Sequence, residues 1–81
     1  MNKNEFIREL SNKTNYSIEE CTKINEILEN NFIISKQSKE KIINSLVNEL
    51  NYTLEEADNI YNISVEMIAK SIKEKLKHPF N

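Results

Sequence analysis

Lysines recur near the C-terminal end of the chain at a spacing suited to binding an anion. Lys70, Lys73 and Lys77 are three and four residues apart, so on a helix they share one face. Between positions 70 and 78, four lysines stand against one acid, Glu74. Such a face could contact nucleic acid, or it could be a solvated helix end whose cations complement the helix dipole. We retain both interpretations.

The other residue types that support catalysis have structural explanations. The single cysteine, Cys21, falls on an apolar stripe, where unpaired cysteines act as small buried hydrophobes. The single histidine, His78, precedes Pro79 at the end of a predicted helix and has no identifiable catalytic partner. One cysteine and one histidine cannot build a zinc site or a disulfide framework. We predict no catalytic, cofactor-binding or metal-binding residues and no small-molecule substrate.

Composition excludes several further classes of function. The 81 residues contain no glycine, which phosphate-binding loops, dinucleotide fingerprints and nucleophile elbows need where the backbone approaches a ligand. The net charge is -2, so the whole chain is not a basic nucleic-acid binder. No apolar stretch approaches the roughly 18 residues of a membrane span, and the first residues lack a secretion signal. We expect one soluble cytoplasmic domain over residues 1–81, with an enzyme ranked behind two binding functions.

An internal repeat with an offset of 36 residues organises the chain. The alignment needs no gap and places apolar residues on apolar residues and turn on turn. Its identities include Lys3/Lys39, Ile7/Ile43, Leu10/Leu46, Asn15/Asn51, Tyr16/Tyr52, Glu20/Glu56 and Ile24/Ile60. We predict repeat one over residues 2–34 and repeat two over residues 38–77, each a helix, a short turn and a longer helix.

Four helix starts are marked by capping residues. The predicted N-caps are Asn2, Ser17, Ser38 and Thr53. Ser17 with Glu20 and Thr53 with Glu56 have the pattern of capping boxes. The acidic pairs at these two starts could suggest two-carboxylate catalysis, but helix capping accounts for them. Apolar stripes follow each start, and the second stripe is predicted to run from Ile18 to Phe32.

Asparagine marks the turn within each repeat. A helix usually ends on a residue in the left-handed conformation, where glycine is best and asparagine is the common substitute. Asn15 and Asn51 occupy that place in a chain without glycine. No segment alternates with a period of two. The sequence therefore predicts an all-α fold of four helices in two tandem hairpins.

The first repeat resembles the opening of the bacterial histone-like proteins HU and IHF. Residues 1–7, MNKNEFI, and residues 13–17, KTNYS, followed by an acid-rich helix start, carry the resemblance. It covers about residues 1–33, with Asn15 in the place of the family's turn glycine. By analogy with the dimers of that family, the two repeats would pack as a pseudo-dimer. The family grips DNA with a β-saddle and β-arms, which this sequence does not encode, so the resemblance implies the helical body alone.

The apolar stripes are wider than one four-helix core needs. The candidate interface residues are Ile43, Val47, Tyr61 and Ile63. We therefore predict a small non-enzymatic interaction module, an adaptor or regulator whose partner is a protein or a second copy. The alternative is a nucleoid-type DNA-binding protein that uses the face from Lys70 to Lys77.

Overall fold

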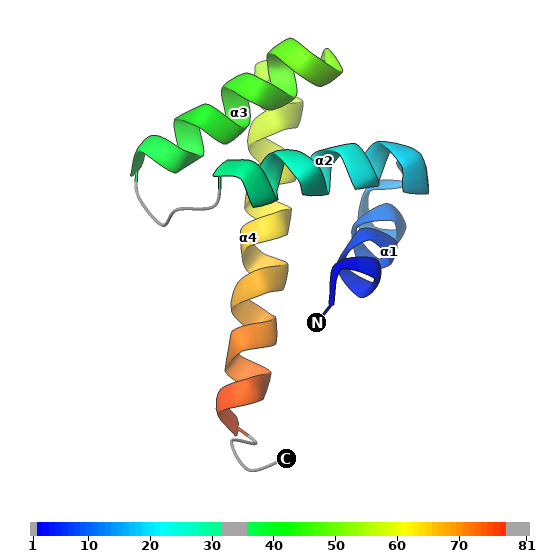
Figure 1. Cartoon of the computed structure of the whole chain (residues 1–81), viewed down its shortest axis with the longest axis vertical. Coiled ribbons are helices and arrows are strands. Elements are labelled where there is room, and N and C mark those ends of the chain that lie inside the picture. The colour runs from blue at the N-terminus through cyan, green and yellow to red at the C-terminus, as the bar shows by residue number, and fades with distance from the viewer. Residues whose placement is uncertain (1, 32–35, 78–81) are drawn as a thin grey trace.

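A computed structural model shows an all-α protein of four helices (Figure 1). It describes the backbone of residues 2–31 and 36–77 and the side chains of residues 2–31 and 39–71. The helices are α1 (Lys3–Thr14), α2 (Ile18–Asn31), α3 (Lys36–Leu50) and α4 (Leu54–Lys77). No strand occurs in the described ranges. The predicted fold class, with two helical hairpins in tandem, is confirmed.

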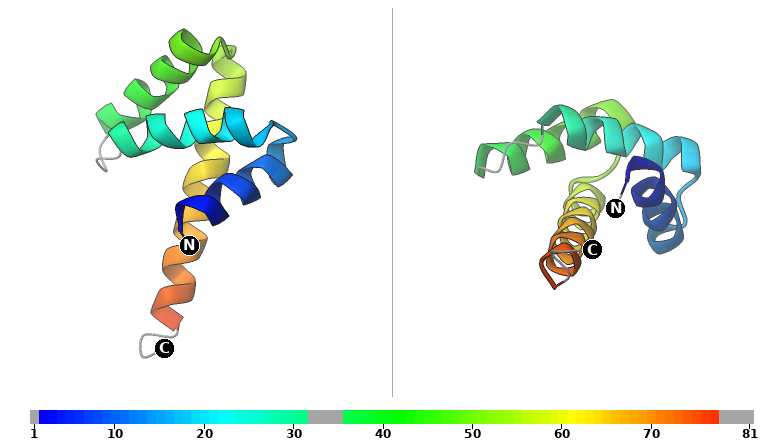
Figure 2. Two further views of the ribbon diagram at one scale, coloured as in Figure 1. Left: turned by 45° about the vertical axis from the view of Figure 1, so that its right-hand side comes forward. Right: turned by 60° about the horizontal axis from the view of Figure 1, so that its bottom comes forward.

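The two hairpins pack on each other through two pairs of helices. Within the hairpins α1 packs on α2 and α3 on α4, while between them α2 packs on α3 and α1 on α4. If the two hairpins are exchanged, α1 takes the place of α3 and α2 that of α4. The α2–α3 contact then becomes the α1–α4 contact. The C-terminal half of α4 extends beyond the other helices, as both views in Figure 2 show. One flank of α4 faces α1 and another faces α3.

The core is built from positions that are 36 residues apart. Five such pairs are buried in both hairpins. They are Phe6/Ile42, Leu10/Leu46, Cys21/Ala57, Ile24/Ile60 and Leu28/Ser64. Other equivalent pairs differ in burial: Ile7 and Ile27 are buried, whereas Ile43 and Ile63 are half-buried. A duplicated helical hairpin remains our proposal for the origin of the repeat.

Both intrahairpin turns adopt the predicted conformation. Asn15 has φ 66° and Asn51 has φ 61°, and they are the positive-φ residues of the described chain. The Asn15 N–H donates to the carbonyl of Ser11 at 2.8 Å, which closes the end of α1. This is the hydrogen bond of a left-handed C-terminal cap.

Helix α3 begins earlier than the sequence predicted. It starts at Lys36, so Ser38 lies inside the helix and is not its N-cap. The three other predicted starts have a glutamate three residues after the cap, whereas Ser38 is followed there by Lys41. The sequence at Ser38 therefore lacks the acid that a reciprocal capping box requires.

The predicted stripe of α2 is also corrected at its first residue. Ile18 is 52% exposed, and its equivalent in the second repeat, Leu54, is 68% exposed. Each is the first residue of its helix, and the buried residues of α2 begin one turn later, at Cys21. Phe32, at the other end of the predicted stripe, lies outside the described residues.

Candidate functional site

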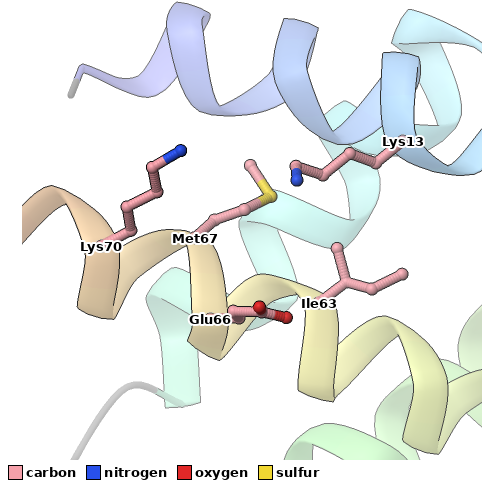
Figure 3. A pocket seen from close by; sticks show the side chains of 5 residues that line it. All are labelled: Lys13, Ile63, Glu66, Met67 and Lys70. Carbon is pink, nitrogen blue, oxygen red and sulfur yellow. The ribbon is translucent and has the colours of Figure 1, made fainter.

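A groove between α1 and α4 is the best candidate for a binding site. Its volume is about 300 Å³, and it is lined by Lys13, Ile63, Glu66, Met67 and Lys70. Figure 3 shows the Lys13 and Lys70 side chains reaching from opposite helices into the space beside Met67. The volume is at the lower end of ligand pockets, which span roughly 300–1,000 Å³. The groove therefore suits one or two side chains better than a large cofactor.

Helical periodicity places the α4 side chains of the groove. Ile63, Met67 and Lys70 lie at i, i+4 and i+7, so they form a row on the flank that faces α1. Met67 is buried at 4% exposure and Ile63 is half-buried, while Lys70 is exposed. Lys13 enters from the last turn of α1. Ile63 and Met67 therefore form the apolar floor of the groove, between the amines of Lys13 and Lys70.

Among the side chains that the structure describes, no acid forms an ion pair with the amines of Lys13 and Lys70. The ion pair of the described residues joins Lys39 and Asp58 at 3.7 Å on the other flank of α4. In Figure 3 the Glu66 carboxylate turns away from both lysine amines. A bound carboxylate next to an apolar side chain would therefore find complementary charge and an apolar surface together.

The structure separates the four predicted interface residues. Ile43, Val47, Tyr61 and Ile63 are half-buried and pack against the core. Ile63 lines the α1–α4 groove, whereas the Tyr61 ring lies 5.5 Å from the Lys39 amine of α3. These two residues are on different flanks of α4, so the four side chains form no common face.

One residue of the predicted basic face reaches the groove. Lys70 lines it, while the side chains of Lys73 and Lys77 lie outside the described residues, as does His78. Sequence reasoning missed Lys13 and Glu66 as site residues. The periodicity of α4 could have pointed to Met67 and Lys70 together. Nothing local could have paired them with Lys13, because that contact depends on how the hairpins pack.

Two tyrosines join the hairpins on the side of the turns. The rings of Tyr16 and Tyr52 lie 5.3 Å apart between centroids and are tilted by 35°. The Tyr52 hydroxyl donates a hydrogen bond to the Glu20 carboxylate of the opposite hairpin. The predicted capping box at Ser17 is therefore half-formed. The Glu20 N–H donates to Ser17 Oγ at 3.1 Å, but the Glu20 carboxylate accepts its hydrogen bond from the Tyr52 hydroxyl.

The second capping box forms as predicted. The Glu56 N–H donates to Thr53 Oγ1 at 3.1 Å, and the Thr53 N–H donates to Glu56 Oε1 at 3.0 Å. Glu56 also lies close enough to Tyr16 to act on it: burial, then the charges of Glu56 and Glu20, raise the pKa of the Tyr16 hydroxyl. Tyr52 thus contacts the capping glutamate of the other hairpin, while the charge of Glu56 acts on Tyr16.

The shifted tyrosines predict a loss of stability in strong alkali. Burial and then the hydrogen bond to Glu20 raise the pKa of Tyr52 above that of an unfolded tyrosine, about 10. Above pH 10 the unfolded state releases a proton that the folded state retains, so the free energy of unfolding falls as the pH rises. Chemical denaturation between pH 8 and 11 would measure this decline.

Tyr52→Phe provides the control for this prediction. The variant loses the hydrogen bond to Glu20, and we expect a cost of about 1 kcal/mol at neutral pH. Its stability should then fall less steeply above pH 10, with Tyr16 and Cys21, whose pKa values are also raised, supplying the remaining slope. Equal slopes for both proteins would show that Tyr52 is not held protonated by the fold.

Cys21 is a core residue, as predicted. It is fully buried, and its thiol lies 3.9 Å from the Tyr16 carbonyl. Burial, which outweighs a hydrogen bond to Thr14, raises the pKa of the Cys21 thiol. This keeps the sulfur protonated and away from reagents, the opposite of a nucleophilic cysteine. Within the described residues, no group of three acidic, histidine or cysteine side chains is placed to hold a metal ion.

Comparison with known proteins adds no relative. No protein-family model, curated protein or solved structure matches the chain. The likeness to HU and IHF therefore depends on the residues quoted above. None of the helices described is long and apolar enough to cross a membrane.

Proposed function

We propose that the protein is a small, non-enzymatic interaction module that binds a segment of another polypeptide in the α1–α4 groove. The observation that supports it is an apolar floor, Ile63 and Met67, beside the amines of Lys13 and Lys70, which pair with no acid among the described side chains. Side chains in the floor would be covered on binding, and the amines would attract an acidic partner.

The chemistry of the groove favours a polypeptide that combines apolar and acidic side chains. Burial of one large apolar side chain contributes about 1.5–3 kcal/mol. The two lysines at the rim would favour acidic partners and speed association, but they would add little affinity. A DNA duplex presents only charge to such a site, and two amines are well below the roughly 6–10 phosphate contacts of strong DNA binders.

Selection from a display library of short random peptides on the immobilised full chain would test this proposal. We expect enriched peptides to carry a large apolar residue beside acidic ones. The double variant Lys13→Glu/Lys70→Glu should weaken their binding by about tenfold or more, since like charges across an interface are repulsive. Lys23→Glu, an exposed lysine of α2, is the matched control and should leave binding unchanged.

Two results would contradict the proposal. One is enrichment of peptides that bind the double variant as tightly as the original chain. The other is an absence of selectable peptides together with salt-dependent binding of duplex DNA, which would favour the DNA-binding alternative.

A further inference from the structure

We infer that the α1–α4 groove binds a second copy of this chain, through the start of its α4. This inference depends on the proposed function and names the partner. The groove needs an exposed apolar side chain next to acids, and the chain itself presents one. Leu54 is 68% exposed, the largest exposure among the large hydrophobic side chains described. It is followed directly by Glu55 and Glu56, which are both exposed.

The two surfaces are complementary in charge, and each presents an apolar side chain beside its charged groups. The groove offers the amines of Lys13 and Lys70 on either side of an apolar floor. The start of α4 presents Leu54 as a projecting apolar residue, with the Glu55 carboxylate adjacent to it. Leu54 would lie on Ile63 and Met67, and the acidic side chains would face the two amines.

The start of α2 is the alternative donor and is less suitable. Ile18 occupies the equivalent position, but it is 52% exposed. Its second acid, Glu20, is half-buried and accepts the hydroxyl of Tyr52, so only Glu19 is available to a partner. At the start of α4 both glutamates are exposed to solvent, and Glu56, although one of its oxygens accepts from the Thr53 N–H, stays accessible. This difference assigns the contact to Leu54.

The assembly must be head-to-tail. Leu54 and Ile63 are nine residues apart in α4, about two and a half helical turns, so they point to opposite sides of the helix. A copy that receives Leu54 in its groove therefore has its own Leu54 free for another copy. Such contacts build rings or open chains. We therefore expect oligomers larger than a dimer to form at high protein concentration.

Analytical ultracentrifugation of the full chain and two blocked variants tests this inference. We expect the average mass of the original chain to rise past a dimer with concentration. Leu54→Gln, which removes the projecting side chain, and Lys13→Glu/Lys70→Glu, which blocks the groove, should each be monomeric. Mixed together they should form a one-to-one heterodimer and nothing larger, because each supplies the surface that the other lacks. Circular dichroism would verify that both variants are folded.

Ile18→Gln and Lys23→Glu are the matched controls and should assemble like the original chain. The inference fails if the original chain is monomeric throughout, if the mixed variants do not associate, or if Ile18→Gln abolishes assembly as Leu54→Gln does. A monomeric chain that still selects acidic peptides through Lys13 and Lys70 would overturn the second copy as partner and leave the proposed function standing.

Discussion

Replacing Leu46 with alanine is expected to lower the free energy of unfolding by about 3 kcal/mol. Leu46 is fully buried in α3, and removal of such a side chain loses its transfer free energy and leaves a cavity, at a cost of about 2–5 kcal/mol. For a chain of this length the total stability is on the order of 4–12 kcal/mol. The single change would therefore remove a large part of it.

Leu10→Ala is the matched variant in the first hairpin. Leu10 is equivalent to Leu46 and is also fully buried, so we expect a similar cost. The controls are Ile18→Ala and Leu54→Ala, whose side chains are exposed and should cost less than about 0.5 kcal/mol. Urea denaturation of the four variants measures all of these values. A large effect at Ile18 with a small one at Leu10 would contradict the described packing.

The second large effect is expected at the turns. Asn15→Val and Asn51→Val should each destabilise the protein by about 2 kcal/mol. Both positions have positive φ, which a β-branched residue adopts only with strain. The variants would force the turn to rearrange where the hairpin reverses direction. Thermal unfolding followed by circular dichroism measures the change.

Glycine at the same two positions distinguishes backbone strain from a lost side-chain contact. It adopts the left-handed conformation without steric cost, so Asn15→Gly and Asn51→Gly should be as stable as the original chain or slightly more stable. If valine were tolerated at both turns, or if glycine were as harmful as valine, the left-handed turns would not be the cause.

The local features of the fold were predictable because they depend on neighbouring residues. The left-handed Asn15 and Asn51, and the capping box of Thr53 with Glu56, follow from short patterns that operate within one turn of helix. The start of α3, which was predicted wrongly, also depends on a short local pattern. Ser38 has the residue type of an N-cap, but Lys41 stands where the other starts have an acid.

The candidate site could be predicted only in part, because it depends on packing between hairpins. Lys70 and Ile63 were marked by their spacing in α4, but Lys13 is distant in sequence and joins them only when α1 packs on α4. The same holds for Glu20. Its place in a capping pattern predicted a bond to its own helix start, whereas the approach of Tyr52 from the other hairpin redirected the carboxylate.

The central claim is that the two hairpins form one domain joined at Tyr16 and Tyr52, and this packing creates the α1–α4 groove. Nuclear Overhauser spectroscopy of the full chain tests it most directly. Since the ring centroids are 5.3 Å apart, we predict strong cross-peaks between the ring protons of Tyr16 and Tyr52. A spectrum in which each ring contacts only its own hairpin would contradict the account.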